Sequence, residues 1–286
     1  MLLSSTAMDL NSKIEKAIST ISQFDGAVVA LSAGVDSSLV ALLAKKALSD
    51  RVVAATAVSE SLSPGELDIA EKTAREIGIE HVIVRTDELR NSDYVANSGN
   101  RCYYCKETLY QELRTLADRL GFETILDGTQ LDDLSDDRPG LQAAREAGVK
   151  SPLLVAGFSK NDVREAAKVL GLSVWDKPAM PCLSSRIPHG EQVTVEKLSA
   201  IGQAELFVKN LTGVRDLRVR HQDGLARVEV APEERHLLCD ERIMDLVDEQ
   251  LRKLGFTAVT LDLRGYRKKV VSSPGSDNLV LPVVTG

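Results

Sequence analysis

Residues 27–38, AVVALSAGVDSS, decide the fold of this chain. The apolar run at residues 27–31 is typical of a short buried strand, and Ser37 opens a stretch with helical periodicity that reaches about Leu48. Small residues between a strand and a helix let successive N–H groups point into one space, where the helix N-terminus also favours an anion. We therefore predict a phosphate-binding loop, with a plain Ser- and Gly-rich turn as the alternative. The residues expected to bind phosphate are Ser32, Gly34, Val35, Asp36, Ser37 and Ser38.

Strands and helices alternate outward from this loop. The alternation indicates an α/β fold, in which a doubly wound parallel sheet has helices on both faces. The expected strands are residues 51–58, 81–85 and 124–127, and the expected helices are residues 64–77, 102–120 and 160–170.

The pattern changes after about Gly190, where the strands become shorter. We therefore predict a smaller α+β domain at residues 191–270, after a first domain at residues 1–190 and before a tail at residues 271–286. The expected elements of the smaller domain are helices at residues 194–210 and 232–254 and strands at residues 215–219, 225–230 and 258–263.

The composition is that of an ordinary globular protein. The chain has 286 residues, of which 43% are hydrophobic, and its net charge is −7. An acidic chain without a basic tail is a poor general ligand for nucleic acid, so we expect no nucleic-acid partner. No apolar run reaches the roughly 18 residues that span a bilayer, and the N-terminus lacks a secretory signal. We therefore expect a cytoplasmic protein, whose four cysteines do not form structural disulfides.

The loop at Ser32–Ser38 has neither the GK[ST] of a Walker A loop nor a GxGxxG fingerprint. It resembles the SGGxDS loop of the PP-loop ATP pyrophosphatases, with Ala33 where glycine is usual. That alanine would be strained if the position requires a positive φ. The resemblance implies that ATP binds with Mg²⁺ and that AMP is released through an adenylated substrate. It also implies nucleotide contacts from Asp127, Gly128 and Lys160, although a solvated lysine is the alternative for Lys160.

Three cysteines lie in suggestive positions. Cys102 and Cys105 form a CxxC motif at the start of an expected helix, and Cys182 lies in the segment PAMPCLSSRIPHG. Three thiolates suit a [4Fe–4S] cluster that leaves one iron free for an extra sulfide. Structural zinc, with His189 as a fourth ligand, and a redox pair beside an independent Cys182 nucleophile are the alternatives. Cys239, expected inside a helix, is assigned no chemistry.

The segment PAMPCLSSRIPHG at residues 178–190 resembles the LarE-type sulfur transferases, and the resemblance extends from about Ile14 to Tyr266. It implies that a carboxylate of pyridinium-3,5-biscarboxylic acid mononucleotide is adenylylated and then converted to a thiocarboxylate. Because the CxxC motif is present, the chain resembles the three-cysteine branch, in which an iron–sulfur cluster delivers sulfide from a separate source. In other members, the cysteine equivalent to Cys182 gives up its own sulfur.

The same resemblance implies the binding groups for this anionic nucleotide. Ser185 and Arg186 would lie beside the sulfur donor, and guanidinium groups match phosphate and carboxylate geometry. Glu205 and Glu229 match acidic positions that could bind a divalent cation, with ordinary surface carboxylates as the alternative. The implied phosphate ligands are Arg218 and Arg267, and Arg220 shares a strand face with Arg218.

Three other functions remain open from the sequence. A tRNA-thiolating enzyme can share the loop and the three cysteines, but it requires a basic surface. An amide synthase of the same fold would have no use for converging cysteines. An ATP-binding regulatory module with structural zinc is the third alternative. We expect the substrate to be a small nucleotide. We also expect the protein to form a homo-oligomer.

Overall fold

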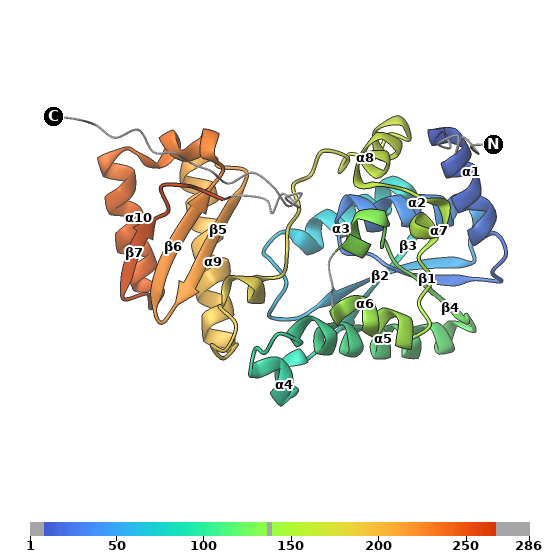
Figure 1. Cartoon of the computed structure of the whole chain (residues 1–286), viewed down its shortest axis with the longest axis horizontal. Coiled ribbons are helices and arrows are strands. Elements are labelled where there is room, and N and C mark those ends of the chain that lie inside the picture. The colour runs from blue at the N-terminus through green and yellow to red at the C-terminus, as the bar shows by residue number, and fades with distance from the viewer. Residues whose placement is uncertain (1–8, 136–138, 267–286) are drawn as a thin grey trace, which may run out of the picture.

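The computed structural model describes residues 9–135 and 139–266. Four parallel strands form one sheet in the order β3-β2-β1-β4, which confirms the predicted α/β architecture (Figure 1). The chain moves from β1 to β2 and β3 on one side and then crosses to β4 on the other, so the direction of winding reverses beside β1. The strands are β1 (Ala27–Ala30), β2 (Val52–Val58), β3 (Glu80–Arg85) and β4 (Thr124–Leu126).

Helices cover both faces of this sheet (Figure 1). On one face α2 (Val35–Leu48) packs on β1 and β2 and α3 (Glu66–Ile77) on β2 and β3, and on the other α5 (Arg101–Leu120) packs on β1, β3 and β4. The remaining helices of this part are α1 (Leu10–Ile21), α4 (Ser92–Val95), α6 (Pro139–Glu146), α7 (Pro152–Ala156) and α8 (Lys160–Val169).

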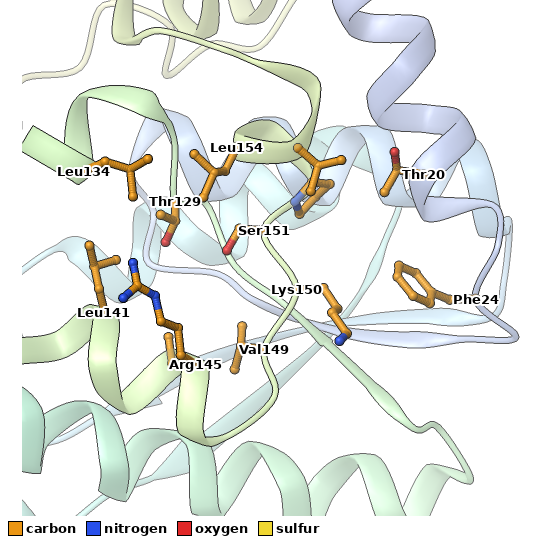
Figure 2. A pocket seen from close by; sticks show the side chains of 13 residues that line it. Thr20, Phe24, Thr129, Leu134, Leu141, Arg145, Val149, Lys150, Ser151 and Leu154 are labelled. Atoms are coloured by element: carbon orange, nitrogen blue, oxygen red, sulfur yellow. The ribbon is translucent and has the colours of Figure 1, made fainter.

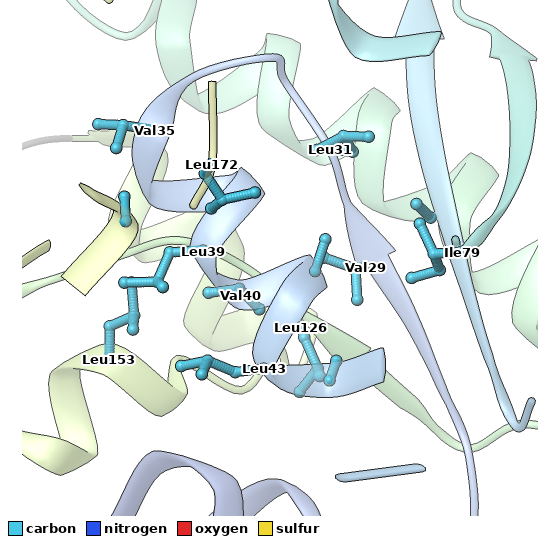
Figure 3. Close-up of a cluster of buried hydrophobic side chains, with 14 of the residues drawn as sticks. Val29, Leu31, Val35, Leu39, Val40, Leu43, Ile79, Leu126, Leu153 and Leu172 are labelled. Carbon is cyan, nitrogen blue, oxygen red and sulfur yellow. The ribbon is translucent and has the colours of Figure 1, made fainter. Parts of the chain in front are cut away.

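Successive residues of β1 pack into two different apolar cores, one on each face of the sheet, which explains why the strand is apolar throughout. Val29 packs with Leu39 and Leu43 of α2 in the cluster drawn in Figure 3. Val28 packs with Leu113 of α5 on the opposite face. A strand buried on both faces cannot alternate apolar and polar residues.

The second part of the chain contains a three-stranded sheet in the order β5-β6-β7. The β5–β6 pair is an antiparallel hairpin, whose turn residues Asp223 and Gly224 have φ of 47° and 84°. Positive φ at both positions suits a tight two-residue turn. The β6–β7 pair is parallel. The elements are α9 (Val195–Thr212), β5 (Leu217–Gln222), β6 (Leu225–Val230), α10 (Glu241–Lys253) and β7 (Ala258–Leu261).

The single helix predicted at residues 232–254 is wrong. A 3₁₀-helix at Pro232–Leu238 is followed by a break, and α10 begins after Asp240, whose side chain accepts a hydrogen bond from the N–H of Ile243. An aspartate N-cap starts a new helix, so the chain bends here. Cys239 lies in the break and is exposed, contrary to its expected place inside a helix. The other 3₁₀-helices are Glu88–Arg90, Leu131–Ser135 and Leu183–Arg186.

The two parts of the chain share an apolar core. Tyr94 of α4, together with Leu183 and Ile187, packs with buried residues of α9 and β5 such as Leu198 and Leu217. The boundary predicted near residue 190 is therefore crossed by continuous packing. No helix in the described parts of the chain has the length and apolar character needed to cross a membrane.

Candidate functional site

The loop after β1 has the geometry of an anion-binding turn. Ser37 Oγ accepts a hydrogen bond from Ser32 N at 3.1 Å and donates to Gly34 O at 3.1 Å, while Ser38 Oγ donates to Gly34 O at 2.8 Å. Ala33 has φ of 58°, so this alanine does occupy a left-handed conformation that favours glycine. The hydroxyl groups hold the loop closed at the N-terminus of α2, where a phosphate is favoured.

The end of β4 lies directly against this loop. A Cβ on Gly128 would be 2.7 Å from Ser37 N and 2.9 Å from the carbonyl carbon of Asp36, which is closer than any side chain tolerates. Asp127 is buried and accepts hydrogen bonds from Ser151 Oγ at 2.6 Å and Thr129 Oγ1 at 2.7 Å. Both β1 and β4 end here, at the place where the winding reverses, which is the usual ligand site of such sheets.

Charged side chains surround the loop. Lys160 Nζ lies 2.5 Å from Asp36 Oδ2, so these two predicted nucleotide residues are in contact. The other carboxylate oxygen, Asp36 Oδ1, is buried and has no hydrogen-bond partner among the described residues. An anionic oxygen left open at a phosphate loop suits Mg²⁺, which prefers carboxylates and phosphates. Lys177, which sequence reasoning missed, donates to Ala33 O at 2.9 Å and to Glu66 Oε2 at 2.7 Å.

The segment that carries Cys182 is fastened to the start of α5, where Cys102 and Cys105 lie. Arg101 is buried and donates to Ser184 O at 2.8 Å. Asn97, also buried, donates from Nδ2 to Pro188 O at 2.6 Å and to Glu191 O at 2.8 Å. These two anchoring residues were not expected from the sequence, although Arg101 directly precedes the CxxC motif.

The three thiols lie in one electrostatic neighbourhood. Burial raises the pKa of the Cys105 thiol, and the nearby thiols of Cys182 and Cys102 raise it further. Cys105 Sγ is 3.8 Å from Glu88 Oε1, and Cys182 Sγ is 3.0 Å from Ser184 Oγ. However, no group of three or more His, Cys, Asp or Glu side chains in the described ranges is arranged to hold a metal ion. The thiolate donor set suits iron, but the side chains as placed do not fit a cluster.

One face of α5 connects the cysteines with the nucleotide loop. Lys106 Nζ lies 5.5 Å from the centre of the Tyr110 ring, and Tyr110 Oη is 3.5 Å from Asp127 Oδ2. Burial lowers the pKa of Lys106, but Tyr110 and Asp127 outweigh this effect and raise it overall. This contact chain leads from the residue that follows the CxxC motif to Asp127 beside the phosphate loop, and the expected convergence of Cys102, Cys105 and Cys182 on the nucleotide stays a prediction.

Arg186 joins the cysteine segment to the second part of the chain. Its buried guanidinium donates to Glu205 of α9 at 2.8 and 3.0 Å, and also to Pro181 O and Cys182 O. Arg186 is thus beside Cys182, as expected, and Ser185 Oγ accepts a further hydrogen bond from it. Glu205 also accepts from Val219 N at 3.0 Å, which leaves this carboxylate engaged by arginine and backbone.

The arginines of β5 differ in their partners. Arg218 is 2% exposed, donates to Ala179 O, and lies 4.7 Å from the centre of the Tyr266 ring. Arg220 instead pairs with Glu229 at 2.9 Å. Because Glu229 also binds Arg227, and Glu205 binds Arg186, the cation site suggested for these glutamates stays a prediction. Arg267 lies outside the described residues.

Comparison with known proteins identifies the family. The NAD synthase family model matches residues 7–100, which include the phosphate loop. An uncharacterised protein of Synechocystis is 47% identical over 90% of this chain and 96% of its own length. The pyridinium-3,5-bisthiocarboxylic acid mononucleotide synthase of Lactiplantibacillus plantarum is 37% identical over 87% of this chain and 90% of its own length. The chain belongs to the family of this synthase.

More distant relatives match a smaller share of the chain. A subunit of the glutamine-hydrolysing GMP synthase of Archaeoglobus fulgidus is 27% identical over 71% of this chain and 71% of its own length. The alignment with the Lactiplantibacillus plantarum synthase covers nearly nine-tenths of the present chain, which is enough to include most of both sheets. The PP-loop assignment and an ATP-dependent activity therefore apply to this chain.

Proposed function

We propose that this chain adenylylates a carboxylate of pyridinium-3,5-biscarboxylic acid mononucleotide and converts it to a thiocarboxylate. The observation that carries the proposal is the position of Arg186, which holds Cys182 O and Pro181 O while pairing with Glu205 of α9. The segment that carries Cys182 thereby joins the nucleotide-binding part of the chain to the part that contains the buried guanidinium of Arg218. An enzyme that transfers sulfur to an adenylylated anion needs these three parts together.

The first step is activation of the carboxylate. In the proposed reaction, a substrate carboxylate oxygen attacks the α-phosphorus of ATP, and pyrophosphate leaves. The N–H groups at the start of α2 and the ammonium of Lys160 would stabilise the charge on the leaving pyrophosphate. Mg²⁺, held by Asp36 Oδ1, would screen the phosphates when bound.

The second step replaces AMP by sulfur. Two sulfur sources belong to the proposal: a [4Fe–4S] cluster on Cys102, Cys105 and Cys182 fed by a sulfide source, or Cys182 itself. Since the described thiols do not form a ligand group, we derive a step only for the second. The Cys182 thiolate attacks the acyl carbon and AMP leaves with the bonding electrons. Loss of the Cys182 Cα proton then breaks the Cβ–Sγ bond, leaving dehydroalanine and a thiocarboxylate.

The second part of the chain supplies the proposed substrate cations. Arg218 has a buried guanidinium that donates to the carbonyl oxygens of Leu217 and Ala179, so a phosphate would offset the cost of burying that charge. Arg220 and Arg267 would complete this site, and we further propose that the enzyme acts as a homo-oligomer. Light scattering of the purified protein tests the oligomer, and a monomer at working concentration would contradict it.

The decisive experiment measures metal and sulfur together. Protein purified without oxygen is analysed for iron, acid-labile sulfide and visible absorption, beside Cys102→Ala and a Cys239→Ala control. The cluster route predicts iron and colour in the parent and control only, with many turnovers of AMP release. The Cys182 route predicts no iron, a single turnover, and a protein that has lost the elements of H₂S from Cys182 by intact mass. Absence of AMP release with this substrate in every sample would refute the function itself.

A tRNA substrate is the competing outcome. The net charge of −7 disfavours a long polyanion. A gel-shift titration with bulk tRNA at moderate salt tests this, and tight binding with tRNA-dependent AMP release would replace the proposal with tRNA thiolation.

A further inference from the structure

A cavity of about 290 Å³ lies between α1, α6 and α7, beside the residues that follow β4. Figure 2 shows its walls, which come from α1, α6 and α7 and from the residues that follow β4. The apolar side chains include Phe24, which follows α1, Leu141 of α6 and Leu154 of α7. The function proposed above uses none of them.

The cavity continues into an apolar patch on the surface. Val155 and Leu134 line it and are 54% and 47% exposed, which is unusual for large aliphatic side chains around one hollow. Contiguous exposed apolar surface around a concavity commonly marks a binding site. A hydrocarbon body in this cavity would remove these side chains from water.

Two cations lie in the same lining. Arg145 and Lys150 are exposed, and their side chains have no hydrogen bond or ion pair with any described residue. The nearest carboxylate along α6, Glu146, is already engaged by Tyr103 and Gln142. A mostly apolar cavity therefore carries two positive charges that pair with no carboxylate of the described residues, and these complement a ligand with one anionic end.

We propose that this cavity binds a small amphiphilic anion, a carboxylate on an apolar chain of medium length. The hydrocarbon lies among Phe24, Leu141 and Leu154, and the carboxylate meets the cation at one end of the cavity, either Arg145 beside Leu141 or Lys150 beside Phe24 (Figure 2). Guanidinium and ammonium groups at the edge of an apolar cavity bind a carboxylate most strongly when the apolar body excludes water from the contact.

The cavity shares two side chains with the nucleotide site. Ser151 and Thr129 line it, and both donate hydrogen bonds to Asp127 beside the phosphate loop. A ligand that contacts these hydroxyl groups changes the hydrogen bonds that they donate to the Asp127 carboxylate. The amphiphile is thus a regulator of ATP binding, and linkage requires that ATP changes amphiphile affinity by the same factor.

The test uses octanoate, its neutral analogue 1-octanol, and the fluorescent anion 1-anilinonaphthalene-8-sulfonate as a reporter. In the full-length protein, octanoate displaces the reporter at about tenfold lower concentration than octanol, as expected for a charge-assisted contact. The double variant Arg145→Gln/Lys150→Gln abolishes this preference, and Val155→Asp weakens both ligands. Octanoate also shifts the ATP dissociation constant, and Ser151→Ala removes that shift.

Matched controls lie outside the cavity. Arg119→Gln/Lys72→Gln removes two exposed cations elsewhere, and Val169→Asp changes an exposed valine of α8, so both keep the parental preference. Equal affinities for octanoate and octanol in the parent, or an unchanged preference in the double variant, would overturn the proposal. If Val155→Asp instead converts a dimer to a monomer in light scattering, a second copy of the chain covers the cavity and the proposal is wrong.

Discussion

The nucleotide loop and the cysteine segment are built by different means. The loop at Ser32–Ser38 is closed by hydrogen bonds between residues no more than five positions apart. The segment around Cys182 is held by side chains from distant elements, with Arg101 contributed by α5 and Glu205 by α9. A local motif keeps its geometry almost by itself, whereas the cysteine segment depends on how the two parts of the chain pack. Substitutions should therefore affect the two sites differently.

The largest expected effect is on the cysteine segment. Arg186→Met leaves the buried Glu205 carboxylate without its guanidinium, since the side chains of this pair are 0% and 3% exposed. Breaking one partner of a buried pair lowers the free energy of unfolding by about 3–5 kcal/mol. Urea denaturation measures the loss, and the double variant Arg186→Met/Glu205→Met should recover part of it.

The control for this variant is an exposed pair. Arg252→Met breaks the ion pair with Asp248 on α10, where the side chains are 54% and 46% exposed. Its cost should stay within about 0.5 kcal/mol. Equal costs for the two variants would mean that Arg186 does not hold the segment.

A substitution at Gly128 tests the nucleotide site with the next largest effect. Gly128→Ala places a methyl group 2.7 Å from Ser37 N, so the end of β4 and the start of α2 must separate. We expect a cost of about 1–3 kcal/mol and a weakening of ATP binding that exceeds the effect on the cysteine segment. Calorimetric titration with ATP and thermal denaturation measure both quantities. Gly99→Ala, which has open space around it, should leave both unchanged.

Asp162, which belongs to the capping box at the start of α8, gives a pH-dependent prediction. Burial raises the pKa of Asp162, but hydrogen bonds from Lys13 and Ser159 outweigh it and hold the pKa below its ordinary value. A lowered carboxyl pKa contributes stability above the unfolded-state pKa, and that contribution disappears as the pH falls below about 4. Asp162→Asn should therefore lower the free energy of unfolding by about 1 kcal/mol at neutral pH. At acid pH, the free energy of unfolding of this variant should fall less than that of the parent. Denaturation between pH 2 and pH 7 tests the change, and an equal loss of stability at acid pH in the variant and the parent would contradict it.

The smallest effect is expected at Ala33. Glycine would relieve the positive φ of 58° there, which is worth about 1–2 kcal/mol, but it would lose a buried methyl group and gain unfolded-state entropy. These contributions nearly cancel, so Ala33→Gly should stay within about 1 kcal/mol of the parent. Ser49→Gly provides the comparison, because Ser49 has φ of 55° but an exposed side chain, and it should be stabilising. A larger gain at Ala33 than at Ser49 would show that the buried methyl group contributes nothing.

The nucleotide site could be predicted largely because its determinants are local. The order of strand, small residues and helix places the loop at residues 32–38, and the positive φ at Ala33 follows from the position that glycine occupies in similar loops. The break at Asp240 could also have been found, since an aspartate before a helical run is an N-cap signal that competes with one long helix.

The cysteine segment could be predicted only in part. Sequence analysis placed Arg186 beside Cys182, but it could not give Glu205 as its partner, because that contact depends on where α9 lies. The same holds for Arg101 and Lys177, whose hydrogen bonds join residues 83 and 144 positions apart. Long-range contacts follow from packing, and no local pattern encodes them.

The apolar core that Tyr94, Leu183 and Ile187 share with α9 and β5 has a consequence for how this protein can be divided. A chain cut near residue 190 would expose these three side chains to water, so the ATP-binding half should be less stable by itself than within the whole chain. Grafting that half onto another carboxyl-terminal module would first require a new apolar face to replace Leu198 and Leu217.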